Sequence, residues 1–398
     1  MRDVFVVDAV RSPVGRLGSA LAAIRPDDLA GQVIVNLMAR SPDLDPADVD
    51  DVYVGNANGA GEDGRNVART AALLGGLPPS VPGTTINRLD GSGVASAIAA
   101  AQAIATGDAD VCVAGGVESM SRAPWVVAKP AHGYTTDDGQ LLSTTSGWRL
   151  VNPRFPVQWT SPLGEMVDRA ADELAIARPV QDAWALSSHQ RARAAWDAGR
   201  FDHEVVPVRG ARIRVDECVH RDLAAHDLAR QPAQRVDGTV TTGNAAPMGD
   251  GAAMMLMTSA LGLDRCGGTP IARVAARAVV ADDPRSVSAA AVRAARTAME
   301  RAAIDFGDLT VVEIGDAFAA QSIAMLGALP ELNRAIVNPN GGAIAIGHPV
   351  GAAGARLLTS MANELRRVGG WGLVVIQSEL GEATACILEA VNRENAQN

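Results

Sequence analysis

One pattern occurs in both halves of this chain, and this repeat constrains the fold more than any other feature. In the first half, a glycine turn precedes an alanine-rich helix and a short apolar strand over residues 91–114. The same order returns over residues 347–376. A second matching pair is formed by residues 51–57 and 311–317. Similarity on this scale indicates duplicated α/β halves, each with helices packed on its own sheet.

Composition and charge exclude several classes of protein. The 398 residues, 47% of them hydrophobic, suffice for a large buried core in two halves. A net charge of -10 argues against nucleic-acid and anionic-membrane partners. We find no secretory signal pattern and no apolar run long enough to span a bilayer, so we expect a cytoplasmic protein.

The sequence predicts no metal centre. The four cysteines lack the spacing of metal ligands, which indicates scattered reduced thiols. Asp90, Glu379 and His348 also match no recognised ligand pattern. The cysteines are Cys112, Cys218, Cys266 and Cys386.

The turn at residues 87–93 is the predicted centre of the functional site. It follows the apolar stretch 84–89 and precedes the helix 94–105, so the order is strand, sharp turn, helix. A side chain at position 90 would lie at the positive end of this helix, where anions are stabilised and nucleophiles are often held. The residue there is Asp90. Since aspartate is also a favoured helix N-cap, a purely structural role is the alternative.

The second repeat places His348, between Gly347 and Pro349, at the equivalent turn. Sites in such sheets form where strands end and helix N-termini point inward. We therefore expect Asp90 and His348 to face one another. A carboxylate beside an imidazole fixes its tautomer and lets it act as a general base on water. A structural histidine is the alternative.

Seven blocks of the sequence match one known family: residues 11–16, 61–66, 107–110, 115–124, 147–149, 250–253 and 338–349. On these blocks the chain closely resembles the thiolase family over nearly its whole length, and most of all the β-ketoadipyl-CoA thiolase branch. The resemblance implies a five-layer α-β-α-β-α fold of two duplicated halves with an inserted loop domain. We expect an N-terminal half at 1–262 with the insert at about 122–244, a C-terminal half at 263–398, and a homodimer or homotetramer.

The resemblance also assigns the catalytic positions. Thiolases pass an acyl group through a cysteine to CoA, or run the reverse condensation. The nucleophilic cysteine of the family falls on Asp90, and the second, acid-base cysteine falls on Gln377. The asparagine that holds an oxyanion-hole water falls on Gly315, and the serine that touches the pantetheine arm falls on Ala246. Of the catalytic groups, only the histidine is kept, as His348.

Other residues complete the predicted site. Asp316, Glu379 and Gly347 are expected to form the pocket around the oxyanion position. For Phe318 a plain core role is the alternative. The positions expected beside the pantetheine channel are Leu163, Thr242, Ala246, Ala317 and Phe318.

The replaced cysteines predict a β-keto acyl thioester (or related β-dicarbonyl) substrate but non-thiolase chemistry. A carboxylate at a helix N-terminus is a weak nucleophile, and its acyl form is a high-energy mixed anhydride. Gln377 cannot exchange protons at neutral pH. We therefore expect either hydrolytic cleavage through an Asp90–His348 dyad or decarboxylation, in which His348 and Gln377 would stabilise an enolate. The carboxylates Asp90, Asp316 and Glu379 would repel a carboxylated substrate, which weakens the second option.

Two alternatives without catalysis stay open. One is a thiolase-like subunit that pairs with an active acyl-transferase partner in a heteromer. The other is a protein that binds an acyl thioester, carried on CoA or on a carrier protein. We expect no required cofactor, and CoA or acyl-CoA is one ligand that the site could bind.

Overall fold

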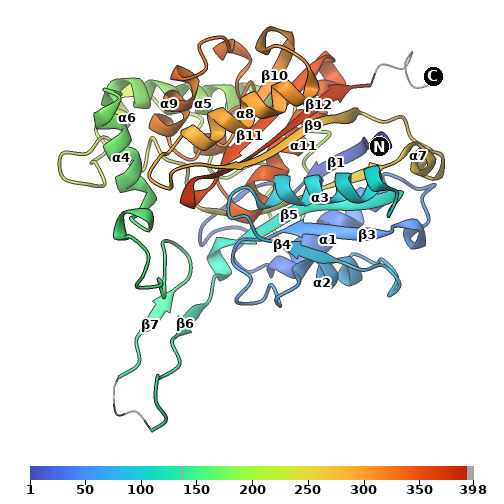
Figure 1. The fold of residues 1–398 in the computed structure, drawn as a ribbon, viewed down its shortest axis with the longest axis horizontal. Coiled ribbons are helices and arrows are strands. Elements are labelled where there is room, and N and C mark those ends of the chain that lie inside the picture. The colour runs from blue at the N-terminus through green and yellow to red at the C-terminus, as the bar shows by residue number, and fades with distance from the viewer. Residues whose placement is uncertain (135, 137, 392–398) are drawn as a thin grey trace.

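The computed structural model describes residues 1–134, 136 and 138–391 (Figure 1). Most of its strands belong to one ten-stranded sheet that runs in the order β10-β11-β12-β9-β1-β8-β5-β3-β4, with β2 paired to β8. A separate hairpin of β6 and β7 projects away from the body (Figure 1). Among the described residues, none of the helices combines the length and apolar character needed to cross a bilayer.

The first half contributes the run β1-β8-β5-β3-β4 of this sheet. Neighbours β1–β8 and β8–β5 are antiparallel, whereas β5–β3 and β3–β4 are parallel. The strands are β1 (Phe5–Arg11), β2 (Gly15–Arg16), β3 (Asp51–Gly55), β4 (Thr84–Ile86), β5 (Val111–Ser119) and β8 (Gly249–Thr258), and the helices are α1 (Pro26–Ala39), α2 (Val67–Leu74) and α3 (Ser92–Thr106).

The second half repeats this arrangement. Neighbours β9–β12 and β12–β11 are antiparallel and β11–β10 is parallel. A short pairing of β1 with β9 joins the two runs. The strands are β9 (Ala272–Ala281), β10 (Leu309–Ile314), β11 (Trp371–Gln377) and β12 (Glu382–Ala390), and the helices are α8 (Ala289–Ala302), α9 (Ala319–Gly327), α10 (Ala343–Ile346) and α11 (Val350–Val368). Helix α7 (Ala260–Cys266), between the two halves in the sequence, packs on the first half.

Three apolar cores separate the layers, so the expected five-layer fold is confirmed. In the central core, α3 and α11 pack together against strands of both halves. On the outer faces, α1 and α2 cover the first half, and α8 and α9 cover the second. Small residues permit the close central packing, because a Cβ atom added at Gly93 of α3 would lie 2.3 Å from the backbone nitrogen of Ala355 on α11.

Local sequence signals explain where the helices begin and end. Helix α1 begins at Pro26 with Asp27 and Asp28 in its first turn, where proline and acidic side chains suit the free N–H groups. Helix α3 ends at Gly107, which has φ = 89° in the left-handed region that favours glycine. The packing of α3 against α11 and β5 then positions the turn that carries Asp90.

The inserted region contains short helices and the projecting hairpin. Its elements are β6 (Trp125–Val127), β7 (Leu141–Ser143), α4 (Leu163–Glu173), α5 (Arg178–Asp197) and α6 (Ala225–Ala229). Figure 1 shows that α4 to α6 lie beside the second half of the chain, near α9. The boundaries predicted at 122, 244 and 262 stay a prediction.

Candidate active site

A cavity of about 220 Å³ lies where the turns ahead of α3 and α11 meet. Asp90 and His348 both line it, and each residue is 8% exposed. Glu379, from the turn after β11, lines the same cavity. The cavity therefore brings together two carboxyl groups and an imidazole.

The turn ahead of α3 holds Asp90 in a fixed position. Leu89, just before it, has φ = 50°, a left-handed conformation that non-glycine residues rarely adopt and that costs free energy. Ser378 fastens this turn, since its hydroxyl accepts from the Gly91 N–H (2.9 Å) and donates to the carbonyl of Arg88 (2.8 Å). The second half of the chain thus supports the turn that presents Asp90.

The turn ahead of α11 positions His348 in the same way. Gly347 has φ = 109°, and a Cβ atom there would lie 2.8 Å from Cγ1 of Val14, so the position requires glycine. The His348 N–H donates to the carbonyl of Pro247 (2.9 Å). As a result, Nε2 of His348 lies 2.7 Å from Oδ1 of Asp90. Its buried Nδ1 has no partner among the described residues.

Glu379 differs from an ordinary surface glutamate. Burial and the nearby charge of Asp90 raise its pKa to about 7, and the positive charge of Arg149 opposes this rise. A carboxyl group with such a pKa donates and accepts protons near neutral pH.

Several predicted site residues do not line this cavity. Gln377 is directed toward the start of α8, where its amide donates to the carbonyl of Ser286 (2.7 Å) and accepts from the Ala291 N–H (3.1 Å). Its side chain therefore reaches backbone groups outside the cavity, and the enolate-stabilising role proposed for it is wrong. It borders a smaller neighbouring cavity with Asp90.

The residues after β10 are also displaced from their predicted role. Asp316 is fully buried, and its Oδ1 accepts from Nε1 of Trp184 (2.8 Å) and from the Ser322 hydroxyl (2.7 Å) in a separate, water-sized cavity. Desolvation raises its pKa to about 6. Gly315 packs against Ile376 and not against the main cavity, since a Cβ atom added at Gly315 would lie 2.5 Å from Cγ1 of Ile376. Neither residue lines the main cavity; Gly347 shapes it only through its backbone.

Four of the five predicted pantetheine-contacting positions line the cavity: Leu163, Ala246, Ala317 and Phe318. Thr242 does not, since its hydroxyl donates to Oε1 of Gln231 (3.1 Å).

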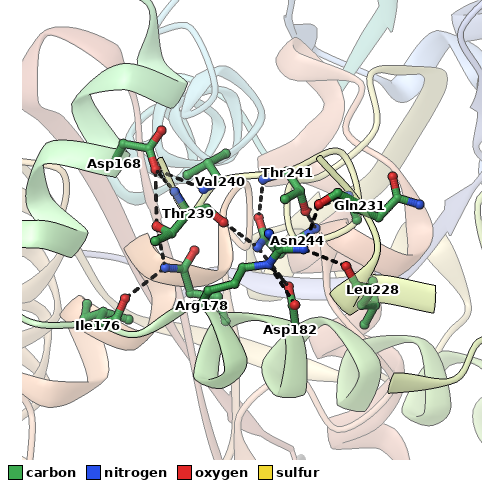
Figure 2. A network of polar contacts seen from close by, with 12 residues as sticks. Asp168, Ile176, Arg178, Asp182, Leu228, Gln231, Thr239, Val240, Thr241 and Asn244 are labelled. Atoms are coloured by element: carbon green, nitrogen blue, oxygen red, sulfur yellow. Dashed lines mark hydrogen bonds and ion pairs between the residues drawn. The ribbon is translucent and has the colours of Figure 1, made fainter. Parts of the chain in front are cut away.

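A polar network holds the loop that leads to Ala246 (Figure 2). The amide of Asn244 donates to Oδ1 of Asp182 (3.0 Å) and accepts from the Thr241 N–H (2.8 Å). Nearby, Asp168 accepts from the N–H groups of Thr239 (2.7 Å) and Val240 (2.9 Å). Helices α4 and α5 of the insert thereby fix one wall of the cavity.

The family of the chain follows from its match to two family models. Residues 4–260 match the thiolase N-terminal domain, and residues 268–390 match the thiolase C-terminal domain. The chain belongs to the thiolase family.

Relatives in this family cover the whole chain. The β-ketoadipyl-CoA thiolase of Pseudomonas putida is 43% identical over 98% of this chain and all of its own length. The 3-oxoadipyl-CoA/3-oxo-5,6-dehydrosuberyl-CoA thiolase of Escherichia coli strain K12 is also 43% identical, with the same coverage.

Two solved thiolase structures are also closely similar. The acetyl-CoA acetyltransferase of Bacillus anthracis has a TM-score of 0.90 and human mitochondrial 3-ketoacyl-CoA thiolase one of 0.91, each at 33% identity. Each match covers 98% of this chain and 99% of the other chain.

These names correct the functional prediction made from the sequence. The whole-length relatives are named as thiolases, which points to ordinary thiolase activity, so the prediction of hydrolysis or decarboxylation is wrong. The two non-catalytic alternatives receive no support from these names either. Glu379 is part of the physical reason for this error. The sequence argument looked for the proton carrier of the family only at Gln377, which cannot exchange protons, and overlooked Glu379, whose pKa is about 7.

The cysteines lie away from the thiolase cavity. All four are buried, and none lines the cavity in the described part of the chain. Cys218 lies behind the turn at Gly347, and burial raises the pKa of its thiol to about 11. A thiol with such a pKa is protonated and a poor nucleophile at neutral pH.

The sequence argument missed two charged residues that line the cavity. Glu118 is fully buried, and its Oε2 accepts from the N–H groups of Ala57 (2.8 Å) and Gly351 (2.9 Å), the latter at the start of α11. Arg149 follows β7. Both lie inside blocks that carried the family resemblance, 115–124 and 147–149, and this was the available signal.

Proposed function

We propose that this chain binds a β-ketoacyl-CoA thioester in the cavity and uses CoA to cleave the bond between C2 and C3 of the acyl chain. The observation that carries the proposal is the meeting of Asp90, His348 and Glu379 in one cavity of a thiolase-family chain. The names of the relatives support the reaction and the substrate class. CoA enters as a substrate, and no cofactor beyond it is needed.

On this proposal, Asp90 and Gln377 occupy the positions of the two cysteines that other thiolases use. In thiolases, the first of these positions carries the acyl group before CoA accepts it. The acyl group must therefore wait on the protein while one thioester leaves and CoA enters. We propose Asp90 as its carrier. A carboxylate is a weaker nucleophile than a thiolate, but carboxylates serve as covalent nucleophiles in other enzymes, and the high energy of the acyl form drives its later transfer to CoA.

The first half of the reaction forms the acyl-aspartate. The carboxylate of Asp90 attacks the C3 carbonyl, and the C2–C3 bond breaks. The electron pair left on C2 takes the proton of Glu379, whose pKa of about 7 leaves it partly protonated at neutral pH. Acetyl-CoA then leaves, and the remaining acyl group is held on Asp90 as a mixed anhydride.

The second half transfers this acyl group to CoA. His348 takes the proton of the incoming thiol, the thiolate attacks the acyl carbonyl, and the carboxylate of Asp90 departs. A mixed anhydride is higher in energy than a thioester, so this step is downhill. The proton on His348 then returns through solvent to Glu379, which restores the starting state.

The test is an analysis of the products made by the pure protein from 3-oxoadipyl-CoA and CoA. The proposal predicts CoA-dependent cleavage that Asp90→Asn and His348→Ala each reduce by about 10²- to 10⁴-fold. The exposed residues Asp264 and His203 supply matched controls, since Asp264→Asn and His203→Ala should leave the rate unchanged. Absence of cleavage by the unaltered protein would reject the proposal.

We further propose that the chain works as a homodimer or homotetramer, as its resemblance to thiolases implies. Light scattering after size-exclusion chromatography of the pure protein tests this. A monomer, or a requirement for a second protein before cleavage begins, would contradict it.

A further inference from the structure

Arg149 supplies the only lysine or arginine side chain that lines the cavity in the described part of the chain. It lies in the loop after β7 and contacts the loop after β3. Its guanidinium donates to the carbonyl of Gly147 (3.0 Å) and to Oδ1 of Asn58 (3.3 Å). It takes part in none of the ion pairs found among the described residues.

The guanidinium of Arg149 has unused donors. Arginine carries five N–H groups, and two of them are used here. None of its nitrogens is among the buried atoms without a partner, and Arg149 lines the cavity, so the unused donors are accessible to a ligand there. A carboxylate accepts two such N–H groups in parallel, which makes the contact both strong and directional.

Asn58 holds Arg149 in place. Its side-chain amide donates to the hydroxyl of Thr144 (2.9 Å), and its backbone N–H donates to Oε1 of Glu118 (3.3 Å). Arg149 is thus tied to the segment that also supports the start of α11, next to His348. This anchoring lowers the entropy that the side chain loses when it binds a ligand.

The other charges of the cavity leave Arg149 without a dedicated counter-ion. Glu118 is occupied by backbone and side-chain N–H donors, and burial raises its pKa to about 7. Glu379 has a similarly raised pKa and is partly neutral. Asp90 is engaged with His348. A substrate with an uncharged acyl chain would leave the guanidinium unpaired, whereas an anionic substrate group would pair with it.

We propose that Arg149 binds the terminal carboxylate of the acyl chain, which makes β-ketoacyl thioesters of dicarboxylic acids the preferred substrates. This inference rests on the proposed function and names its substrate class. Such a contact would also offset the repulsion between the carboxylate of the substrate and the carboxylates of Asp90 and Glu379.

A phosphate of CoA offers the same chemistry, but it stands a whole pantetheine arm away from the thioester. Arg149 instead shares one cavity with Asp90 and lies close enough to Glu379 to oppose the rise in its pKa. These observations favour the acyl chain as the source of the anion.

The test compares 3-oxoadipyl-CoA with 3-oxohexanoyl-CoA, which has the same chain length and no terminal charge. Arg149→Gln should lower kcat/KM for 3-oxoadipyl-CoA by about 10- to 100-fold and change the value for 3-oxohexanoyl-CoA by less than about threefold. Arg149→Lys should restore part of the loss, because it keeps the charge but not the fork of donors. The exposed Arg154 gives the matched control, Arg154→Gln.

Equal losses for the two substrates would overturn the inference, since they would assign Arg149 to the CoA phosphates or to the fold. Equal kcat/KM values for the two substrates in the unaltered protein would overturn it as well, while the proposed function would stand. If the unaltered protein cleaves neither substrate, the proposed function fails. Calorimetric titration of both thioesters then tests Arg149 separately, and the inference requires a selective loss of 3-oxoadipyl-CoA affinity in Arg149→Gln. If Arg149→Gln does not fold, the same comparisons apply to Arg149→Lys.

Discussion

Glu379→Gln tests both the energetics and the chemistry of the cavity. The pKa of Glu379 rises from 4.5 to about 7 because the carboxyl group is buried and lies near the charge of Asp90. The folded protein therefore binds more protons at this position than the unfolded chain does between pH 4.5 and about 7. It follows that the free energy of unfolding falls as the pH rises through this window.

The size of this effect follows from the shift. Each pKa unit corresponds to about 1.4 kcal/mol, so the full shift would amount to roughly 3 kcal/mol, and partial exposure of the side chain reduces it to about 1–3 kcal/mol. Glutamine cannot ionise and avoids this loss. Between pH 4.5 and pH 8, the free energy of unfolding of the unaltered protein should therefore fall by about 1–3 kcal/mol relative to that of Glu379→Gln.

Urea unfolding of both proteins at these two pH values measures the difference. Other buried acids titrate in the same window, but they are common to both proteins and cancel. The exposed Glu300 on α8 provides the matched control, and Glu300→Gln should show no such pH dependence. A stability difference that stays constant from pH 4.5 to pH 8 would refute the reasoning.

The same variant has a predicted effect on catalysis. Without the proton of Glu379 at C2, we expect cleavage of the β-ketoacyl-CoA to slow by about 10²- to 10⁴-fold. In the unaltered protein, the rate should fall on the alkaline side with an apparent pKa of about 7, as Glu379 ionises. A variant that keeps full activity would remove Glu379 from the mechanism.

Three further predictions concern the scaffold and the thiols. Arg11→Met leaves the buried carboxylates of Glu204 and Asp216 without their partner, so urea unfolding should show a loss of about 3–5 kcal/mol, whereas the same change at the exposed Arg214 should cost little. Gly347→Ala forces a Cβ atom against Val14 at a positive φ, so we expect a loss of about 1–3 kcal/mol by denaturant titration and a larger loss of activity. Iodoacetamide should leave the activity of the native protein unchanged, because all four cysteines are buried outside the cavity, and rapid inactivation would contradict this.

Much of the fold could be predicted from local patterns. The helix predicted at 94–105 lies inside α3, and the helix and strand expected in the second repeat, 347–376, are α11 and β11. By contrast, β8 was not predicted, because all of its residues are buried and it shows no alternation between apolar and polar positions. The internal repeat was the more informative signal, since it pairs segments that are far apart in the sequence.

The site was harder to predict, because an equivalent position in the sequence fixes a Cα atom and not the direction of a side chain. The two turns brought Asp90 and His348 into one cavity, where their backbone is held tightly. The side chain of Gln377 is longer than the cysteine of the family at this position, and it hydrogen-bonds to the backbone near α8 instead of entering the cavity. The group with a pKa near 7 is Glu379, two residues further along, and its environment depends on burial that the sequence alone did not reveal.

The central claim is that CoA, and not water, accepts the acyl group in this cavity. The most direct measurement is a chromatographic analysis of the products formed from 3-oxoadipyl-CoA by the unaltered protein and by Asp90→Asn. We predict acetyl-CoA and a second acyl-CoA in equal amounts when CoA is present, at most one acetyl-CoA per active site when CoA is absent, and almost no product from Asp90→Asn. A free carboxylic acid as product, or an Asp90→Asn variant as active as the unaltered protein, would contradict the account.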